Sequence, residues 1–229
     1  DQGVFESADR FLEICRTGEG IAEDYSFIQD VVDANDEGRT YVLEGYLYPD
    51  TYEIYVGSSE ETVIGRMLDR MNVIYGVAYR TRAEELGMDM DEVITLASMI
   101  ERETAGSGES GKIASVIYNR LCDPAYPYLN IDATIQYALG ERKADLSYAD
   151  LQIDSPYNTY TNPGLPAGPI ANPGLNSLKA ALHPADTSYY FYALDEDGTH
   201  HFSETAEEHE QFLENLRNGR DDDDETQEP

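Results

Sequence analysis

Residues 88–104 read MDMDEVITLASMIERET, and this stretch keeps helical periodicity along its whole length. Asp89 and Glu92 have the spacing of a capping box, in which two side chains satisfy free backbone N–H groups at a helix start. On a helical wheel the apolar residues form one broad arc, made of Val93, Ile94, Leu96, Ala97, Met99 and Ile100. The sequence therefore predicts a buried helix that runs from Asp89 to Thr104.

Two carboxylates, Glu101 and Glu103, lie on opposite edges of this apolar arc. A carboxyl group held against apolar neighbours has its charged form destabilised, so its pKa rises and it can serve as a general acid. The spacing alone does not choose between the two residues. It also fits two surface carboxylates that pair with Arg102 or with nearby chains.

The segments around this helix predict the fold class. Helices are expected over 5–16, 25–34, 58–86, 109–121, from Asn176 or Ser177 to about His183, and from about Thr205 onward. Residues 43–55, LEGYLYPDTYEIY, predict strand, turn and strand, because Pro49 and Asp50 interrupt two aromatic runs. Residues 189–194 (YYFYAL) and 200–203 predict a hairpin. Central helices flanked by small β elements indicate an α+β fold.

Charge and composition exclude several classes of function. The chain has 229 residues, 46 of them acidic and 15 basic, for a formal net charge of -31. Such a chain repels phosphate backbones and anionic lipids, so no nucleic-acid partner is expected. No apolar stretch approaches the roughly 18 residues that span a bilayer. Because the chain starts at Asp1 without methionine, we expect an excised fragment whose membrane anchor lies upstream. Cys15 and Cys122 are expected to be two buried thiols.

Five blocks of sequence, in this order, resemble the endolytic transglycosylase family of bacterial cell-wall assembly, which carries the YceG-like domain. They are LEGYLYPDTYEI (43–54), LASMIERET (96–104), KIASVIYNRL (112–121), LNIDATIQYALG (129–140) and SPYNTYTNPGLPAGPIANPGLNSLKAALHP (155–184). The resemblance implies an N-terminal helical segment at 1–40 that links to a LysM-like subdomain. It further implies a catalytic domain at 41–215, followed by an acidic disordered tail at 216–229.

The resemblance also implies a reaction and a site. The family's catalytic glutamate falls on Glu101, which would protonate the glycosidic oxygen of N-acetylmuramic acid and then deprotonate the C6 hydroxyl that closes a 1,6-anhydro ring. Substrate contacts are expected from Glu44, Asp50, Thr51, Tyr52, Asp132, Thr134, Gln136, Tyr157, Asn158, Thr159, Tyr160 and Ile170. The expected partners are peptidoglycan strands and cell-wall synthesis proteins, at the extracytoplasmic membrane face. No cofactor or metal is expected, and His200 and His209 are assigned structural or surface roles.

Two other functions stay open at this point. In a hydrolytic muramidase, a second carboxylate such as Asp132 or Asp154 would activate water, within about 5–10 Å of the acid. In a non-catalytic glycan-binding module, neither glutamate would take part in chemistry. Chain ends separate the enzymes, because hydrolysis leaves reducing ends and transglycosylation leaves anhydro ends.

Overall fold

The computed structural model describes residues 7–34, 38–104 and 108–225, with side chains described as far as Asn218. The helices are α1 (Ala8–Thr17), α2 (Ser26–Ala34), α3 (Glu60–Ile74), α4 (Val77–Leu86), α5 (Met90–Glu103), α6 (Ser110–Cys122), α7 (Asp132–Leu139), α8 (Leu175–Leu182) and α9 (Ala206–Glu225). Strands β1 (Phe191–Leu194) and β2 (His200–Ser203) form an antiparallel pair. The predicted α+β class is confirmed, with helices dominating. Within the described ranges, no helix is long and apolar enough to cross a membrane.

Helix α5 lies at the centre of the molecule. Its predicted capping box is present, since the Asp89 side chain accepts from the Glu92 N–H and the Glu92 side chain accepts from the Asp89 N–H. All eight residues from Val93 to Ile100 are buried.

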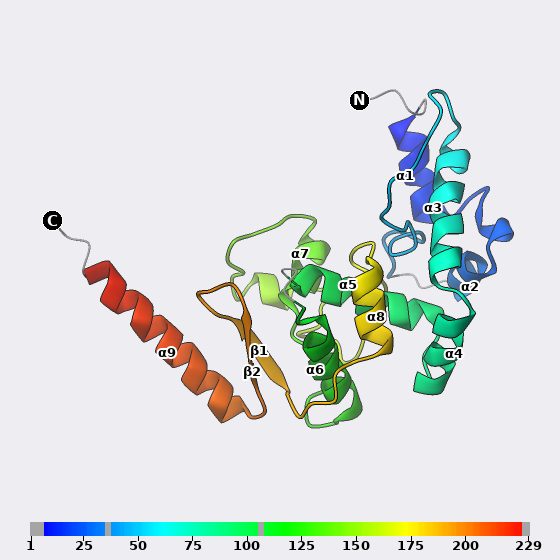
Figure 1. The fold of residues 1–229 in the computed structure, drawn as a ribbon. Coiled ribbons are helices and arrows are strands. Elements are labelled where there is room, and N and C mark those ends of the chain that lie inside the picture. The colour runs from blue at the N-terminus through cyan, green and yellow to red at the C-terminus, as the bar shows by residue number, and fades with distance from the viewer. Residues whose placement is uncertain (1–6, 35–37, 105–107, 226–229) are drawn as a thin grey trace.

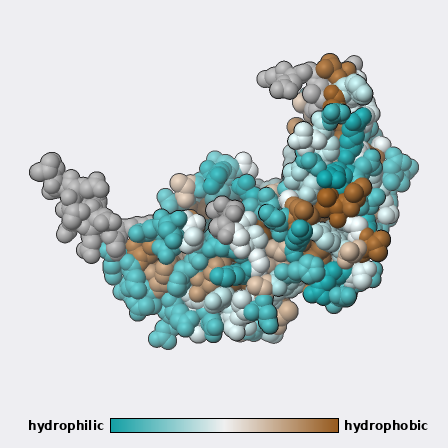
Figure 2. All heavy atoms as spheres, viewed as in Figure 1, coloured by the Kyte–Doolittle hydropathy of each residue, from teal (hydrophilic) through white to brown (hydrophobic). Residues whose placement is uncertain are grey.

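Figure 1 shows α6, α7 and α8 gathered around α5. The N-terminal helices lie at one end of an elongated molecule, and α9 projects at the other. Figure 2 shows that most of this face is hydrophilic, as the acidic composition requires.

The strand–turn–strand predicted for 43–55 is wrong, because this segment is a loop of successive turns. Its backbone groups bind partners far away in the sequence instead of a neighbouring strand. The Leu43 N–H donates to the Cys15 carbonyl at 3.0 Å. The N–H groups of Gly45 and Leu47 both donate to Oδ1 of Asn172, at 3.0 and 3.1 Å. Gly45 also has φ +90°, which is outside the β region.

Two further sequence predictions need correction. The single helix predicted over 58–86 is two helices, because the chain breaks at Tyr75 and Gly76 and α4 starts after Gly76 as its N-cap. Helix α7 is an element that the sequence does not predict. It begins at Asp132 without a side-chain cap, so the usual start signal is missing from its sequence.

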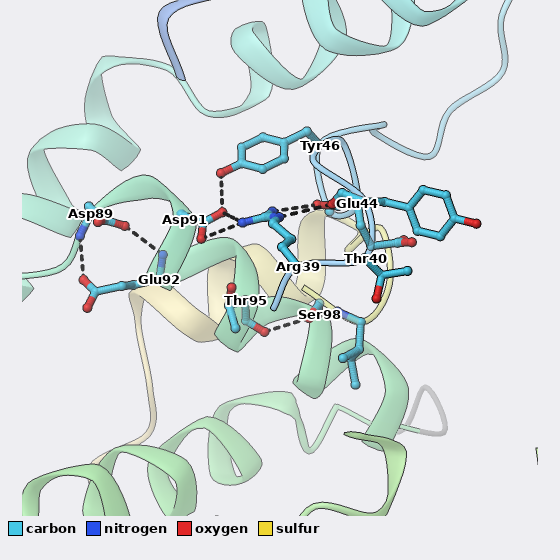
Figure 3. A network of polar contacts seen from close by, with 12 residues as sticks. Arg39, Thr40, Glu44, Tyr46, Asp89, Asp91, Glu92, Thr95 and Ser98 are labelled. Atoms are coloured by element: carbon cyan, nitrogen blue, oxygen red, sulfur yellow. Dashed lines mark hydrogen bonds and ion pairs between the residues drawn. The ribbon is translucent and has the colours of Figure 1, made fainter. Parts of the chain in front are cut away.

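Polar contacts fasten two long loops onto α5, as Figure 3 shows for one of them. The Arg39 guanidinium donates to both carboxylate oxygens of Asp91, at 2.8 and 2.9 Å. Tyr46 donates its hydroxyl to Asp91 at 2.6 Å. On the other loop, the Ile170 N–H donates to Oγ of Ser98 at 3.0 Å. These contacts fix both loops on α5.

The predicted hairpin is confirmed, with Phe191 opposite Ser203 and Leu194 opposite His200. Arg120, near the end of α6, fixes this hairpin by donating to the Tyr190 carbonyl at 2.7 Å.

Both cysteines are free thiols. The prediction of burial is right for Cys15 and wrong for Cys122, which is exposed.

Candidate functional site

A cleft of ≈ 1020 Å³ opens between the C-terminal end of α5, the start of α7 and the β1–β2 hairpin. Three carboxylates line it, from Glu101, Glu103 and Asp132. Aromatic rings line it as well, those of Tyr160, Tyr190, Phe191 and Tyr192. Carboxylates beside aromatic surfaces suit a polar ring compound such as a sugar, which needs both hydrogen bonds and flat apolar contacts.

Glu103 is partly buried within this cleft. Tyr192 Oη donates to its Oε2 at 3.2 Å. Burial raises the pKa of Glu103, and the negative charge of Asp132 acts in the same direction, while the hydrogen bond from Tyr192 opposes the rise. Burial also holds the pKa of Tyr192 well above its usual value, so Tyr192 remains a hydrogen-bond donor. Glu103 is thus a carboxyl group whose surroundings favour the protonated form, as a general acid requires.

Glu101 has different surroundings, although it lines the same cleft. Its side chain is exposed, and its Oε2 accepts a hydrogen bond from the Gly174 N–H at 3.0 Å and one from Ser177 Oγ at 2.6 Å. Gly174 is the N-cap of α8 and offers no side chain of its own. Glu101 therefore supplies the acceptor that a capping side chain would otherwise supply, at a helix end that favours negative charge.

The helical wheel places Glu101 and Glu103 on opposite edges of α5, and they do contact different elements. Glu101 binds the start of α8, whereas Glu103 binds the hairpin. The structure thereby separates two residues that are equivalent on the wheel. The Glu101 carboxylate accepts hydrogen bonds that stabilise the start of α8. The Glu103 carboxyl group is partly buried beside β1.

A second cavity, of ≈ 760 Å³, adjoins the cleft. Both cavities are lined by the same four residues, Arg102, Ala133, Gln136 and Arg142, so they form one continuous groove. Three tyrosines, Tyr41, Tyr137 and Tyr157, are part of the lining of the second cavity. A groove of this length could hold more than one sugar unit, or one sugar together with a substituent.

Five of the predicted substrate-contacting residues line this groove. Asp132, Gln136 and Tyr160 line the cleft, and Gln136, Tyr157 and Ile170 line the second cavity. Tyr160 donates its hydroxyl to Asp132, which holds that carboxylate at the start of α7. For these residues a contact with substrate stays a prediction that the geometry permits.

Three others lie beneath the groove and bind the protein itself. Thr134 and Thr159 are buried and share a hydrogen bond of 2.9 Å between their hydroxyls. Asn158 is buried and donates to the carbonyls of Leu151 and Ile153. The threonine pair holds the 155–165 loop against α7, and Asn158 ties the same loop to residues 151–153.

The remaining four, on the 44–52 loop, lie outside both cavities. Asp50 pairs with Arg70 at 2.7 Å and also accepts from the Thr51 N–H. Tyr52 donates to the Tyr48 carbonyl. Glu44 is partly buried beside Arg39. Their contacts are those of a folded loop, and a role in binding substrate stays untested.

Replacing Glu44 with glutamine should stabilise the protein at neutral pH. Burial raises the pKa of Glu44, and the positive charge of Arg39 offsets only part of the rise. A group whose pKa is higher in the folded state contributes stability below its unfolded pKa, and that contribution is lost as pH rises through the folded pKa. Thermal unfolding of both proteins from pH 4 to pH 8 should show the gap in Tm opening as pH rises. A constant gap would contradict this account.

Several residues of the groove were missed or left unassigned by sequence reasoning. Arg142, Tyr190 and Tyr192 carried no expectation of a site role, although the aromatic run YYFYAL was recognised as a strand. A tyrosine-rich strand near the end of a helix-rich chain was the available signal. Nothing in the sequence indicated that this hairpin faces the C-terminal end of α5.

His200 and His209 both line the cleft and contact other side chains, and their structural role stays a prediction. His200 contacts Glu109 through its ring Nδ1 at 2.9 Å, and its backbone N–H donates to the same carboxylate. His209 stacks on Phe191 with ring centroids 5.2 Å apart. Across the described ranges, no group of three or more His, Cys, Asp or Glu side chains has the arrangement of a metal site.

Known proteins resemble this chain over most of its length. "Endolytic murein transglycosylase" of Bacillus subtilis strain 168 is 42% identical over 168 residues, covering 73% of this chain and 46% of that protein. The protein of the same name from Streptococcus pneumoniae R6 is 33% identical over 192 residues, covering 81% of this chain and 34% of that one. The chain thus spans less than half the length of these curated relatives.

A solved structure and a family model agree with these matches. The crystal structure of a yceG-like protein from Listeria monocytogenes superposes with a TM-score of 0.75 at 36% identity, covering 90% of this chain and 68% of that one. The model of the YceG-like family matches residues 6–215, which include the cleft, both glutamates and the hairpin. With nine-tenths of its sequence inside that match, the chain belongs to the YceG-like family.

Proposed function

We propose that this chain cleaves the glycosidic bond between N-acetylmuramic acid and N-acetylglucosamine in peptidoglycan, leaving 1,6-anhydro ends. The observation that carries the proposal is the partly buried Glu103 carboxyl, whose pKa is raised within a cleft lined by aromatic rings. The names of the curated relatives support the same reaction. Because the substrate is the cell-wall polymer, the chain would act outside the cytoplasm. The names of the relatives describe endolytic cutting, so we expect cleavage within glycan strands and not at their ends.

Glu103, rather than Glu101, is the acid that the geometry favours. A protonated Glu103 donates its proton to the glycosidic oxygen as the bond to C1 breaks. The carboxylate that remains takes the proton of the sugar's C6 hydroxyl, whose oxygen then bonds to C1. The proton count balances, and no water is consumed. One carboxyl group performs both proton transfers, and its hydrogen bond from Tyr192 can stabilise the intermediate charged form.

The resemblance in sequence assigned this role to Glu101, and that assignment competes with the present one. Two hydrogen bonds from the start of α8 already engage the Glu101 carboxylate. Those bonds hold the carboxylate against the start of α8. Glu101 would then position α8 beside the cleft without exchanging a proton with the substrate.

Hydrolysis is a second candidate, and the position of Asp132 favours considering it. Asp132 lines the cleft and is close enough to Glu103 to raise its pKa. Two carboxylates in one cleft are what an ordinary glycosidase uses, one as acid and one to activate water or attack C1. Asp154, the other carboxylate considered from the sequence, is exposed and lies outside both cavities.

Digestion of purified peptidoglycan, followed by mass spectrometry of the released ends, distinguishes these functions. We expect anhydro-muramic ends from the natural sequence. Reducing ends that disappear in Asp132→Asn would establish the hydrolase instead. The absence of any cleaved product would leave a glycan-binding module.

A further inference from the structure

Arg102 and Arg142 occupy an unusual place in the groove. Each of them lines both the cleft and the second cavity, so the two guanidinium groups flank the junction between these spaces. Arg102 is also the residue between Glu101 and Glu103 on α5. Both arginines have exposed side chains. The junction therefore presents two guanidinium groups to a ligand that enters the cleft.

Neither arginine has a partner among the described residues of the chain. Of the arginines whose side chains are described, all but Arg102, Arg142 and Arg217 make a hydrogen bond or an ion pair, those being Arg10, Arg16, Arg39, Arg66, Arg70, Arg80, Arg82 and Arg120. The chain has 46 acidic residues and only 15 basic ones, so partners for an arginine are abundant. Because partners are abundant, two unpaired guanidinium groups at one junction indicate that they bind something outside the described chain.

Their chemistry indicates an anionic ligand. A guanidinium group presents a planar fork of N–H donors that matches a carboxylate. In a chain with a net charge of -31, an anion is repelled by most of the surface and is bound only where positive charge is locally free. Around the second cavity only one described acidic residue, Glu141, contributes to the lining. The junction and this cavity can therefore accept a carboxylate.

We propose that Arg102 and Arg142 bind the carboxylates of the peptide stem carried by the muramic acid whose bond is cleaved. This inference rests on the proposed function, which places that sugar beside Glu103. The lactyl group of muramic acid carries the peptide on the same ring whose C1 is attacked, so the peptide must leave the cleft close to the catalytic carboxyl. The second cavity, with the partly exposed Tyr41, Tyr137 and Leu139 in its lining, offers apolar surface for the methyl groups of a short peptide.

The experiment compares two substrates and three variants. The substrates are peptidoglycan strands with their peptides and the same strands after an amidase has removed the peptides. The enzymes are the natural sequence, the double variant Arg102→Gln/Arg142→Gln, the double variant Arg102→Lys/Arg142→Lys, and the matched control Arg217→Gln. Arg217 also lacks a partner among the described residues but lies on α9 outside both cavities. The quantity measured is the ratio of kcat/KM on peptide-bearing strands to kcat/KM on stripped strands.

We expect the natural sequence and Arg217→Gln to prefer peptide-bearing strands by about tenfold, the size of one or two partly exposed charged hydrogen bonds. The ratio should fall toward one in the double variant and recover partly in Arg102→Lys/Arg142→Lys, which keeps the charges. Circular dichroism melts confirm that each variant is folded.

Each failure has its own signature. A ratio near one for the natural sequence, with both substrates cleaved, would overturn the stem proposal and leave the proposed function intact. A preference that survives in the double glutamine variant would also overturn it. Cleavage of neither substrate would instead reject the proposed function.

Discussion

Glu103→Gln is expected to reduce the rate of glycan cleavage by about 10²–10⁴-fold, the usual contribution of a general acid. Glutamine keeps the shape of the side chain and can still accept the hydrogen bond from Tyr192, but it has no proton to donate. The matched variant is Glu101→Gln, which lies two residues away on the same helix. Its amide oxygen can still accept from Gly174 and Ser177, so its rate should stay within about tenfold of the natural sequence.

The Glu103→Gln variant should lose activity while its thermal stability increases, which a variant that simply misfolds would not do. The pKa of Glu103 is raised in the folded state, so this residue loses its stabilising contribution as pH rises through that pKa. Glu103→Gln should therefore melt at a higher temperature than the natural sequence at pH 7, while being inactive. Glu101→Ala removes the acceptor of two hydrogen bonds at the start of α8 and should lower the free energy of unfolding by about 1–3 kcal/mol.

The pH profile provides an independent readout of the same assignment. The reaction needs a protonated Glu103, so kcat/KM should fall as pH rises through the elevated pKa of this group. The opposite result, an inactive Glu101→Gln beside an active Glu103→Gln, would return the acid role to Glu101, as the sequence resemblance implied. Product analysis of each variant would confirm that the reaction measured is the same one.

Gly45→Ala is expected to be the most destabilising glycine-to-alanine change among the glycines that the structure describes. A Cβ at this position would lie 2.6 Å from Cγ2 of Ile94 and 2.6 Å from the ring of Pro169. The backbone also has φ +90°, where side chains other than that of glycine are strained. Crowding and strain together should cost about 2–5 kcal/mol. For a chain of this size that corresponds to a fall in Tm of roughly 5–15 °C.

Gly57→Ala is the matched control for Gly45→Ala. Gly57 has a similar φ of +82°, but no atom lies within 4 Å of the position that the added methyl group would take. It should cost only the backbone strain, about 1–2 kcal/mol. Equal losses in the two variants would show that Ile94 and Pro169 move apart easily, and that the 43–55 loop is less tightly fixed on α5 than its contacts indicate.

Local signals account for what the sequence predicted correctly. Helix α5 was predicted with its cap because Asp89 and Glu92 are three residues apart and the apolar arc is continuous. The hairpin followed from an aromatic run and a turn. The 43–55 loop was mispredicted because its backbone N–H groups bind distant partners, such as Asn172, which no local pattern reveals. The division of the chain at residues 40 and 216 stays a prediction, although residue 216 lies within α9.

The sequence also could not distinguish the two glutamates of the site. On the helical wheel Glu101 and Glu103 are equivalent, and the residues that distinguish them are distant in sequence. Ser177 lies 76 residues from Glu101, and Tyr192 lies 89 residues from Glu103. The pKa of Glu103 depends on burial by those later segments, so it could not be inferred before the chain was folded.

The contact between Glu101 and the start of α8 has a consequence for the order of folding. Helix α8 has eight residues and a glycine N-cap, so it lacks a local start signal and is too short to be stable alone. Helix α5 has its own capping box. We therefore expect α5 to form early and α8 to form only after it docks there. In a φ-value analysis, substitutions within α5 should slow folding, whereas Ser177→Ala should mainly speed unfolding.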